Sequence, residues 1–146
     1  MDVKLLEEGL AFMKKDKPAY VRSLAEDFFN MKSKHSTISK EMIDWAVVIT
    51  QEATLRAAME LQSTAFSTDQ RDEVKKIKIP ILLQHGDNDV TSPLPLTAEK
   101  TRDLMPDCRL IVYPHQGHGL HISGWEPVTK DLLEFISRNA DNPLNG

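Results

Sequence analysis

Apolar residues in the first part of the chain recur every three or four positions, which is the spacing of one face of a helix. This pattern predicts helices over residues 3–15, 18–30 and 40–49, the last with Ser39 as its N-cap. A fourth helix is predicted to begin at Thr50 as N-cap and to run to about residue 62. No alternation typical of a strand occurs before residue 78, so this part is predicted to be helical throughout.

The pattern changes after Asp69 to short apolar runs separated by polar loops. Residues 79–83 read I-P-I-L-L, and the length and flanks of this run favour a strand buried on both faces, as in a parallel sheet. Residues 110–113 form a second such run. Helices are predicted between the strands, over 96–105, and after them, where apolar residues return to helical spacing. This alternation is typical of a doubly wound sheet, although two strands alone do not stabilise one.

Polar side chains that can do chemistry follow both predicted strands, where ligands bind in open α/β sheets. They are Asp87, Asp89, His115, His118 and His121. A carboxylate and an imidazole at neighbouring strand ends can form a hydrogen bond, and such a pair orients a histidine that acts as general base. Gly117 and Gly119 flank His118, and we expect them to let the backbone turn tightly there. The alternative is ordinary turn chemistry, because Asp, Asn and Gly are common in loops.

A metal site is a less favoured interpretation of these residues than a catalytic pair. The three histidines are evenly spaced, but the intervening glycines favour a loop over the single helix face that would align them. Asp87-Asn88-Asp89 lacks the glycine and glutamate that complete a calcium-binding EF-hand loop. We therefore predict neither a metal nor a cofactor.

Charge and composition limit the partners. The 146 residues carry a net charge of −4, with basic residues scattered among acidic ones, which argues against nucleic-acid binding. No apolar run approaches the roughly 20 residues that span a bilayer, and the first residues lack the apolar core of a signal peptide. The single cysteine, Cys108, fits a reducing compartment. A cytoplasmic protein without membrane or nucleic-acid partners is expected.

Two segments resemble a known family. IPILLQHGDNDVTSP and LIVYPHQGHGLH are similar to the last two strands of α/β-hydrolases, where a Pro-led strand precedes HGxxD and a later loop ends in HG. The family's chain order is nucleophile, acid, histidine. The resemblance implies that Asp89 is the acid and His118 the base of a catalytic triad. Asp87 fits less well, because the family's acid stands three residues after the strand-end glycine.

The resemblance extends to the helical part. Residues 1–70 resemble the helical cap, or lid, of these hydrolases, and Trp45, the helix through Leu61 and the approach AFSTDQRDEVKKI are most similar to the cofactor-free haloperoxidase and arylesterase group. The implied organisation is a cap over 1–70, the C-terminal portion of the core over 71–140 and a flexible tail over 141–146. The fold class expected is an incomplete α/β-hydrolase: a helical cap followed by two parallel strands of a doubly wound sheet with flanking helices.

The sequence departs from the family in one decisive respect. The family's nucleophile stands in G-x-S-x-G, and no two of the six glycines here enclose a serine at that spacing. Ser123 follows the histidine and has no strand before it, so we do not expect it to be the nucleophile. The oxyanion-hole segment is also missing, and a truncated chain of this kind is predicted to be nearly inactive alone.

Three functions remain open. The first is the C-terminal part of an ester-hydrolysing serine hydrolase, which needs the missing N-terminal half and acts on a small apolar ester or acyl substrate. The second is a non-catalytic truncated module that acts in binding or self-association, because open strand edges favour pairing. The third and least favoured is a standalone enzyme with a surrogate nucleophile, in which His118 acts directly or Ser123 is recruited.

Overall fold

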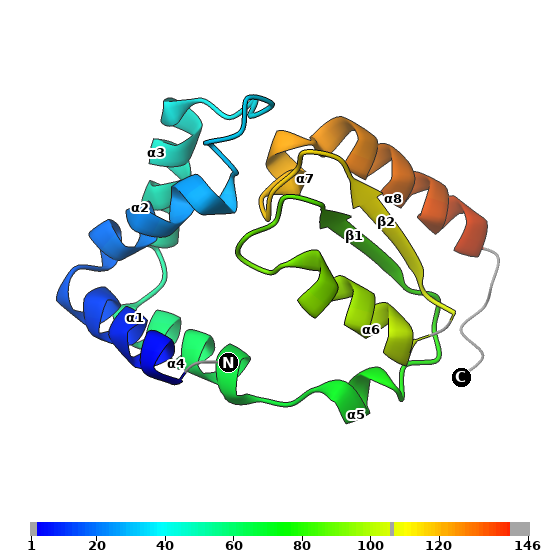
Figure 1. Cartoon of the computed structure of the whole chain (residues 1–146), viewed down its shortest axis with the longest axis horizontal. Helices are drawn as coiled ribbons and strands as arrows, with labels where there is room; N and C mark the ends of the chain where they lie inside the picture. The colour runs from blue at the N-terminus through cyan, green and yellow to red at the C-terminus, as the bar shows by residue number, and fades with distance from the viewer. Residues whose placement is uncertain (1–2, 106, 141–146) are drawn as a thin grey trace. The chain divides into compact units, whose positions relative to one another are not determined.

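The computed structural model describes residues 3–105 and 107–140, which divide into two units. The first unit comprises Met1–Glu26 and Ile38–Asp69, and the second comprises Asp27–Thr37 and Gln70–Gly146. Figure 1 shows the elements of both in chain order. The predicted flexible tail, 141–146, lies outside the described residues.

The first unit is built from helices, as the apolar spacing predicted. They are α1 (Val3–Lys15), α2 (Lys17–Phe28, whose last two residues belong to the second unit), α3 (Lys40–Thr50) and α4 (Leu55–Ser67). Ser39 caps α3 as predicted, since its hydroxyl accepts the N–H of Met42 at 3.1 Å. The predicted cap of the fourth helix is wrong. Thr50 ends α3, and it is Thr54, in extended conformation, that accepts the N–H of Ala57 at 3.1 Å.

Contacts inside the first unit centre on Tyr20. Its ring is buried and stands edge-on to Phe12, with ring centroids 5.7 Å apart. Its hydroxyl accepts a hydrogen bond from the side-chain amide of Gln62 at 2.6 Å, which links α2 to α4. Lys17 donates to the carbonyl of Thr50 at 2.8 Å, near the end of α3 where cations are favoured. These contacts join all four helices, since α1 and α4 also pack together.

The second unit contains two parallel strands, which confirms the predicted fold class. β1 (Leu82–Gly86) pairs with β2 (Arg109–Tyr113), with Leu82 opposite Arg109 and Gly86 opposite Tyr113. β1 begins three residues later than predicted, and Pro80, which has no N–H to donate, lies outside it. The prediction that this strand is buried on both faces was also wrong, because only Gly86 of β1 is buried. Within the described residues the sheet has two strands, so the side chains of β1 keep part of their surface exposed.

The other described elements of the second unit are helices and one 3-10 turn. They are α5 (Arg71–Val74), the 3-10 turn η1 (Leu94–Leu96), α6 (Ala98–Leu104), α7 (Leu120–Ser123) and α8 (Trp125–Asn139). α6 contacts both strands and α8 contacts β1 (Figure 1). The single helix predicted over 96–105 is divided, because Thr97 departs from helical geometry with φ −125° and ψ −87°. Strand, helix, strand, helix is nevertheless the order found.

The core of the second unit lies between β2 and the helices that follow it. Tyr113, Leu120 and Val128 are buried together, and Ile111 packs against them. The Tyr113 hydroxyl donates to Asp131 at 2.7 Å and accepts from the side-chain amide of Gln84 at 2.7 Å. Burial raises the pKa of Tyr113, and the hydrogen bond to Asp131 raises it further, since both favour the neutral phenol.

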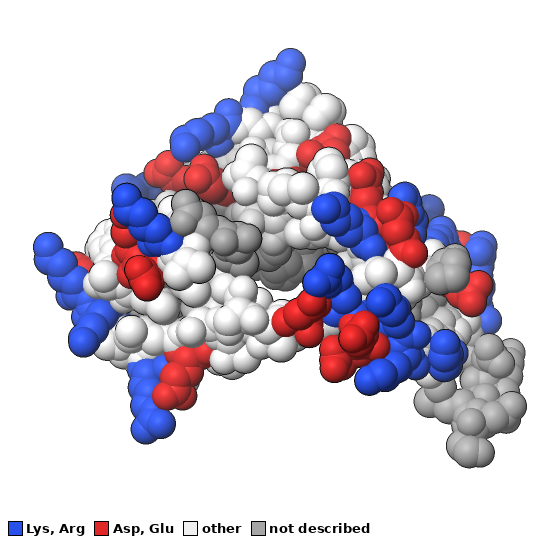
Figure 2. Space-filling view, turned by 60° about the horizontal axis from the view of Figure 1, so that its bottom comes forward, with Lys and Arg blue, Asp and Glu red and all other residues white. Residues whose placement is uncertain are grey.

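Charged side chains of both signs are mixed on the face drawn in Figure 2. Local ion pairs such as Arg56–Glu60 and Lys75–Asp72 join side chains of opposite charge. On that face, the described basic residues do not form the continuous stripe that follows a phosphate backbone. None of the helices in the described part of the chain is both long and apolar enough to cross a membrane. The cytoplasmic location remains a prediction.

Candidate active site

Asp89 lies in the turn that follows β1, directly beside the loop that follows β2. The backbone of this turn is fixed from the neighbouring strand end: Asp87 donates its N–H to the carbonyl of Tyr113 at 3.1 Å, and Asn88 donates to Gln116 at 3.0 Å. Both polar loops therefore meet at the carboxyl ends of the parallel strands, as the sequence predicted.

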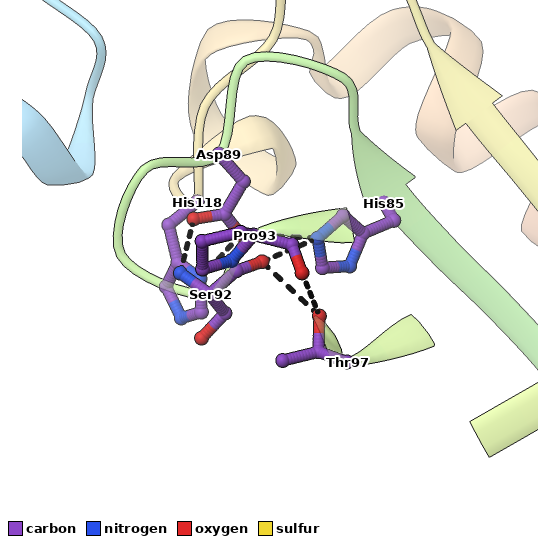
Figure 3. A network of polar contacts seen from close by, with 6 residues as sticks. All are labelled: His85, Asp89, Ser92, Pro93, Thr97 and His118. Atoms are coloured by element: carbon purple, nitrogen blue, oxygen red, sulfur yellow. Dashed lines mark hydrogen bonds and ion pairs between the residues drawn. The ribbon is translucent and has the colours of Figure 1, made fainter. Parts of the chain in front are cut away.

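The carboxylate of Asp89 is surrounded by donors (Figure 3). Its side chain is 2% exposed, and its Oδ1 accepts the N–H of Ser92 at 2.7 Å. Its Oδ2 lies 2.7 Å from Nδ1 of His118 and 3.4 Å from Nε2 of His85. Burying a carboxylate is unfavourable unless hydrogen bonds replace those it made to water, and the hydrogen bonds from Ser92 and His118 do so.

The structure thus brings together the two residues predicted to form a catalytic pair. Because a carboxylate only accepts hydrogen bonds, Nδ1 of His118 carries the proton in this contact. Nε2 of the neutral ring is then the acceptor. The side chain of His118 is 38% exposed, so its ring is not sealed inside the protein. This tautomer is the one that a general base of the Ser-His-Asp type requires.

His85 has a different place in the same network. Its Nε2 lies 2.8 Å from the carbonyl oxygen of Ser92, so that nitrogen must be the donor. Thr97 donates its hydroxyl to the same carbonyl at 3.1 Å and to that of Pro93 at 3.0 Å (Figure 3). His85, which the sequence led us to expect to pack or hydrogen-bond at the strand end, and Thr97 therefore hold the turn that presents Asp89.

Gly117 and Gly119 serve a different purpose from the one predicted. No glycine in the described residues has a positive φ, so neither is needed for a left-handed turn. Both instead allow close approach by residues 28–30. A Cβ at Gly119 would lie 2.4 Å from the ring of Phe29, and one at Gly117 would lie 2.9 Å from Cβ of Asn30. The positive φ in this loop belongs to His115, at 64°.

The other candidate residues lie apart from the Asp89–His118 contact. Asp87 accepts the backbone N–H of His115 at 2.6 Å, and His121 is in α7. The hydroxyl of Ser123 donates to the side chain of Gln116 at 2.7 Å. In residues 3–105 and 107–140, no three His, Cys, Asp or Glu side chains are grouped as they would be to hold a metal ion.

The chain was compared with family models, with curated proteins and with solved structures. No family model matches the chain. It is 40% identical over 73 residues to a bifunctional esterase/perhydrolase of Acinetobacter calcoaceticus, covering 49% of this chain and 26% of that protein. It is 27% identical over 127 residues to the non-heme chloroperoxidase CPO-A1 of Kitasatospora aureofaciens, covering 84% of this chain and 46% of that protein.

Solved structures of other proteins match the fold of this chain over nearly its whole length. A bromoperoxidase from Bacillus anthracis matches with a TM-score of 0.86 and 25% identity, covering 94% of this chain and 50% of that one. An esterase from Exiguobacterium antarcticum matches with a TM-score of 0.84 and 22% identity, covering 94% and 49%. The chain therefore has the fold of part of an α/β-hydrolase, and its match spans half or less of the length of these relatives.

In sequence and in fold, the chain is similar to part of the α/β-hydrolases of the cofactor-free haloperoxidase and esterase group. The resemblance recognised in the two strand-and-loop segments is thereby confirmed.

Proposed function

We propose that this chain supplies the acid, Asp89, and the base, His118, of the catalytic triad of an ester-hydrolysing serine hydrolase. The observation that carries the proposal is the contact of 2.7 Å between Oδ2 of Asp89 and Nδ1 of His118 at the carboxyl ends of two parallel strands. The esterase/perhydrolase among the relatives supports ester chemistry. A small apolar ester or acyl compound is the proposed substrate.

In this mechanism, Nε2 of His118 removes the proton from a serine hydroxyl as the serine oxygen attacks the ester carbonyl. The same imidazolium then gives the proton to the departing alkoxide. Asp89 holds the ring in the required tautomer and stabilises its positive charge, which a buried carboxylate with satisfied hydrogen bonds can do. The acyl group leaves when water repeats the sequence on the acyl-serine.

The serine and the oxyanion-hole donors must come from outside these 146 residues, which contain no G-x-S-x-G. We propose that a preceding segment of hydrolase core, in the same or another polypeptide, provides both. The 146 residues alone are then expected to be nearly inactive, because His118 has no nucleophile to deprotonate. Residues 1–70 are proposed to act as the cap and 71–140 as the C-terminal core portion.

A chimera tests the proposal directly. The half of the Bacillus anthracis bromoperoxidase that this chain does not match is joined to residues 1–146, and the product is assayed with a p-nitrophenyl ester and a fluorophosphonate probe. We expect hydrolysis and one labelled serine, contributed by the bromoperoxidase half. His118→Ala should remove both activities in a protein that is still folded by circular dichroism. Full activity of the folded His118→Ala chimera would overturn the proposal.

The isolated chain provides the complementary experiment. We expect no fluorophosphonate adduct on folded residues 1–146. A stoichiometric adduct that depends on His118 would show that the chain holds its own nucleophile, and it would replace the proposal with that of a standalone enzyme.

Self-association is a second candidate function, and a specific observation favours it. Several apolar side chains of the strand pair and α8 are exposed: Val112, Leu132, Leu133 and Ile136. Exposed apolar surface beside an open strand edge favours pairing with another chain. Sedimentation equilibrium of residues 1–146 distinguishes the cases: a concentration-dependent dimer supports self-association, and a monomer at all concentrations excludes it.

A further inference from the structure

Residues 27–37, here called the supporting segment, lie in the second unit although they come between the two stretches of sequence that form the first. They contact residues 115–123, here called the histidine loop. The N–H of Gly119 donates to the carbonyl of Phe28 at 2.8 Å. The amide of Asn30 donates to the carbonyl of His115 at 3.2 Å, and the hydroxyl of Thr37 donates to the carbonyl of Ser123 at 2.9 Å. The segment is thus fixed along the length of the loop.

Aromatic contacts reinforce these hydrogen bonds. The ring of Phe28 stands edge-on to that of His118, with centroids 4.9 Å apart and planes at 66°. The same ring contacts His121 at 6.4 Å, and it stands against Phe29 at 4.9 Å. The ring of Phe28 therefore contacts both another aromatic ring and the histidines.

A single hydrogen bond does not fix an imidazole ring. The contact of His118 with Asp89 restrains the position of Nδ1, but the ring can still tilt about that bond. Nε2 lies across the ring from Nδ1, so a change in the tilt of the ring changes the direction in which the lone pair of Nε2 is presented. A second ring in a T-shaped contact with the imidazole restricts this movement, because edge-to-face pairs have a preferred geometry.

We propose that Phe28 is a positioning residue for His118: it sets the tilt of the imidazole and thereby the direction in which Nε2 points. This inference deepens the proposed function, because it assigns the orientation of the general base to a residue from outside the strand-end loops. Phe28 is suited to this role because its carbonyl is anchored to Gly119, next to the histidine it contacts. Gly119 is required in turn, because a side chain there would displace the ring of Phe29.

The test uses residues 1–146 labelled with ¹⁵N and ¹³C at histidine, so no catalytic activity is needed. The nitrogen chemical shifts of His118 report its tautomer, and exchange of the Nδ1 proton with water reports how firmly the ring is held. In the wild type we expect the Nδ1–H tautomer. In Phe28→Ala we expect exchange of that proton to become about two- to tenfold faster, the range that corresponds to one aromatic pair. Phe28→Tyr keeps the ring and should restore the wild-type rate.

Phe12→Ala is the matched control, because it removes a ring from the edge-on pair with Tyr20 in the first unit. It should leave the signals of His118 unchanged. If Phe28→Ala does not fold, Phe28→Leu, which fills much of the same volume without a ring, takes its place. The inference is overturned if the Nδ1 proton of His118 exchanges at the wild-type rate in a folded Phe28→Ala or Phe28→Leu protein. It is also overturned if this proton exchanges as fast in Phe28→Tyr as in Phe28→Ala.

Failure of the inference and failure of the proposed function remain distinguishable. The inference concerns the ring of His118 in the isolated chain, whereas the proposed function concerns turnover by the chimera. An active, His118-dependent chimera together with an unchanged His118 in Phe28→Ala would reject only the positioning role.

Discussion

The rings of His85 and His118 both contact Oδ2 of Asp89, but through different nitrogens. His118 faces it with Nδ1 at 2.7 Å, and His85 faces it with Nε2 at 3.4 Å. The nitrogen left over is therefore Nε2 in His118 and Nδ1, close to its own backbone, in His85. The side chain of His85 is also only 12% exposed, against 38% for His118. Of the two histidines on this carboxylate, His118 is therefore the one that fits the proposed role of general base.

Asp89→Asn should invert the tautomer of His118. An amide of similar shape can donate its N–H₂ to Nδ1, so the ring then carries its proton on Nε2 and cannot act as a base. In the active chimera we expect kcat to fall by a factor on the order of 10⁴, the effect of the equivalent change in a serine protease. Nitrogen chemical shifts of His118 in the isolated chain check the cause, and an unchanged Nδ1–H tautomer would contradict it.

Ser123→Ala should leave catalysis intact. The hydroxyl of Ser123 donates to Gln116, and it serves the structure of the histidine loop in this account. We expect the chimera to keep its rate and its fluorophosphonate labelling, with a loss of about 1 kcal/mol in the free energy of unfolding for one hydrogen bond. Loss of labelling in a folded variant would instead identify Ser123 as a nucleophile.

Alanine should have opposite effects at Gly86 and Gly9. A Cβ at Gly86 would lie 2.1 Å from the carbonyl oxygen of Gln116, so the backbone of the histidine loop must move. We expect Gly86→Ala to reduce the free energy of unfolding by about 3 kcal/mol or more. A Cβ at Gly9, inside α1, would meet nothing closer than 3.4 Å, and Gly9→Ala should stabilise by about 0.5–1 kcal/mol. Urea titrations of both variants provide the comparison, and similar midpoints would be inconsistent with this view of the loop.

Tyr113→Phe should weaken the dependence of stability on alkaline pH. Burial raises the pKa of Tyr113, so the folded state holds the phenol proton more tightly than the unfolded state, whose pKa is about 10. The stabilisation is complete below about pH 10 and is lost as the pH rises from there through the folded pKa. The wild type should therefore lose stability more steeply than Tyr113→Phe in this range, as measured by urea unfolding at a series of pH values. Equal slopes would mean that Tyr113 titrates alike in both states.

Much of this architecture was readable from the sequence because it depends on local patterns. Helical spacing predicted the four helices of the first unit, and the short apolar runs predicted both strands. Asp89 and His118 were predicted to come together because parallel strands end at one edge, and their hydrogen bond is found. Their roles in catalysis remain a prediction.

The misjudged features depend on backbone conformation or on contacts between distant residues. The start of the fourth helix was misplaced because Thr50 and Thr54 are equally good caps by composition, and only the backbone conformation selects Thr54. Gly117 and Gly119 were interpreted as turn residues, but the reason for them is the approach of the supporting segment. Neither periodicity nor spacing indicates that approach, because the partners lie more than 80 positions apart in the chain.

That separation has a consequence for the order in which the protein folds. The bonds from Asn30 to His115 and from Thr37 to Ser123 close loops of 85 and 86 residues. The entropy lost on closing a loop grows with its length, and contacts of this kind form late. During synthesis, the supporting segment leaves the ribosome long before the histidine loop exists. His118 can acquire these surroundings only after every residue between the supporting segment and the histidine loop has been made, so we expect this part of the candidate active site to become ordered later than the local helices.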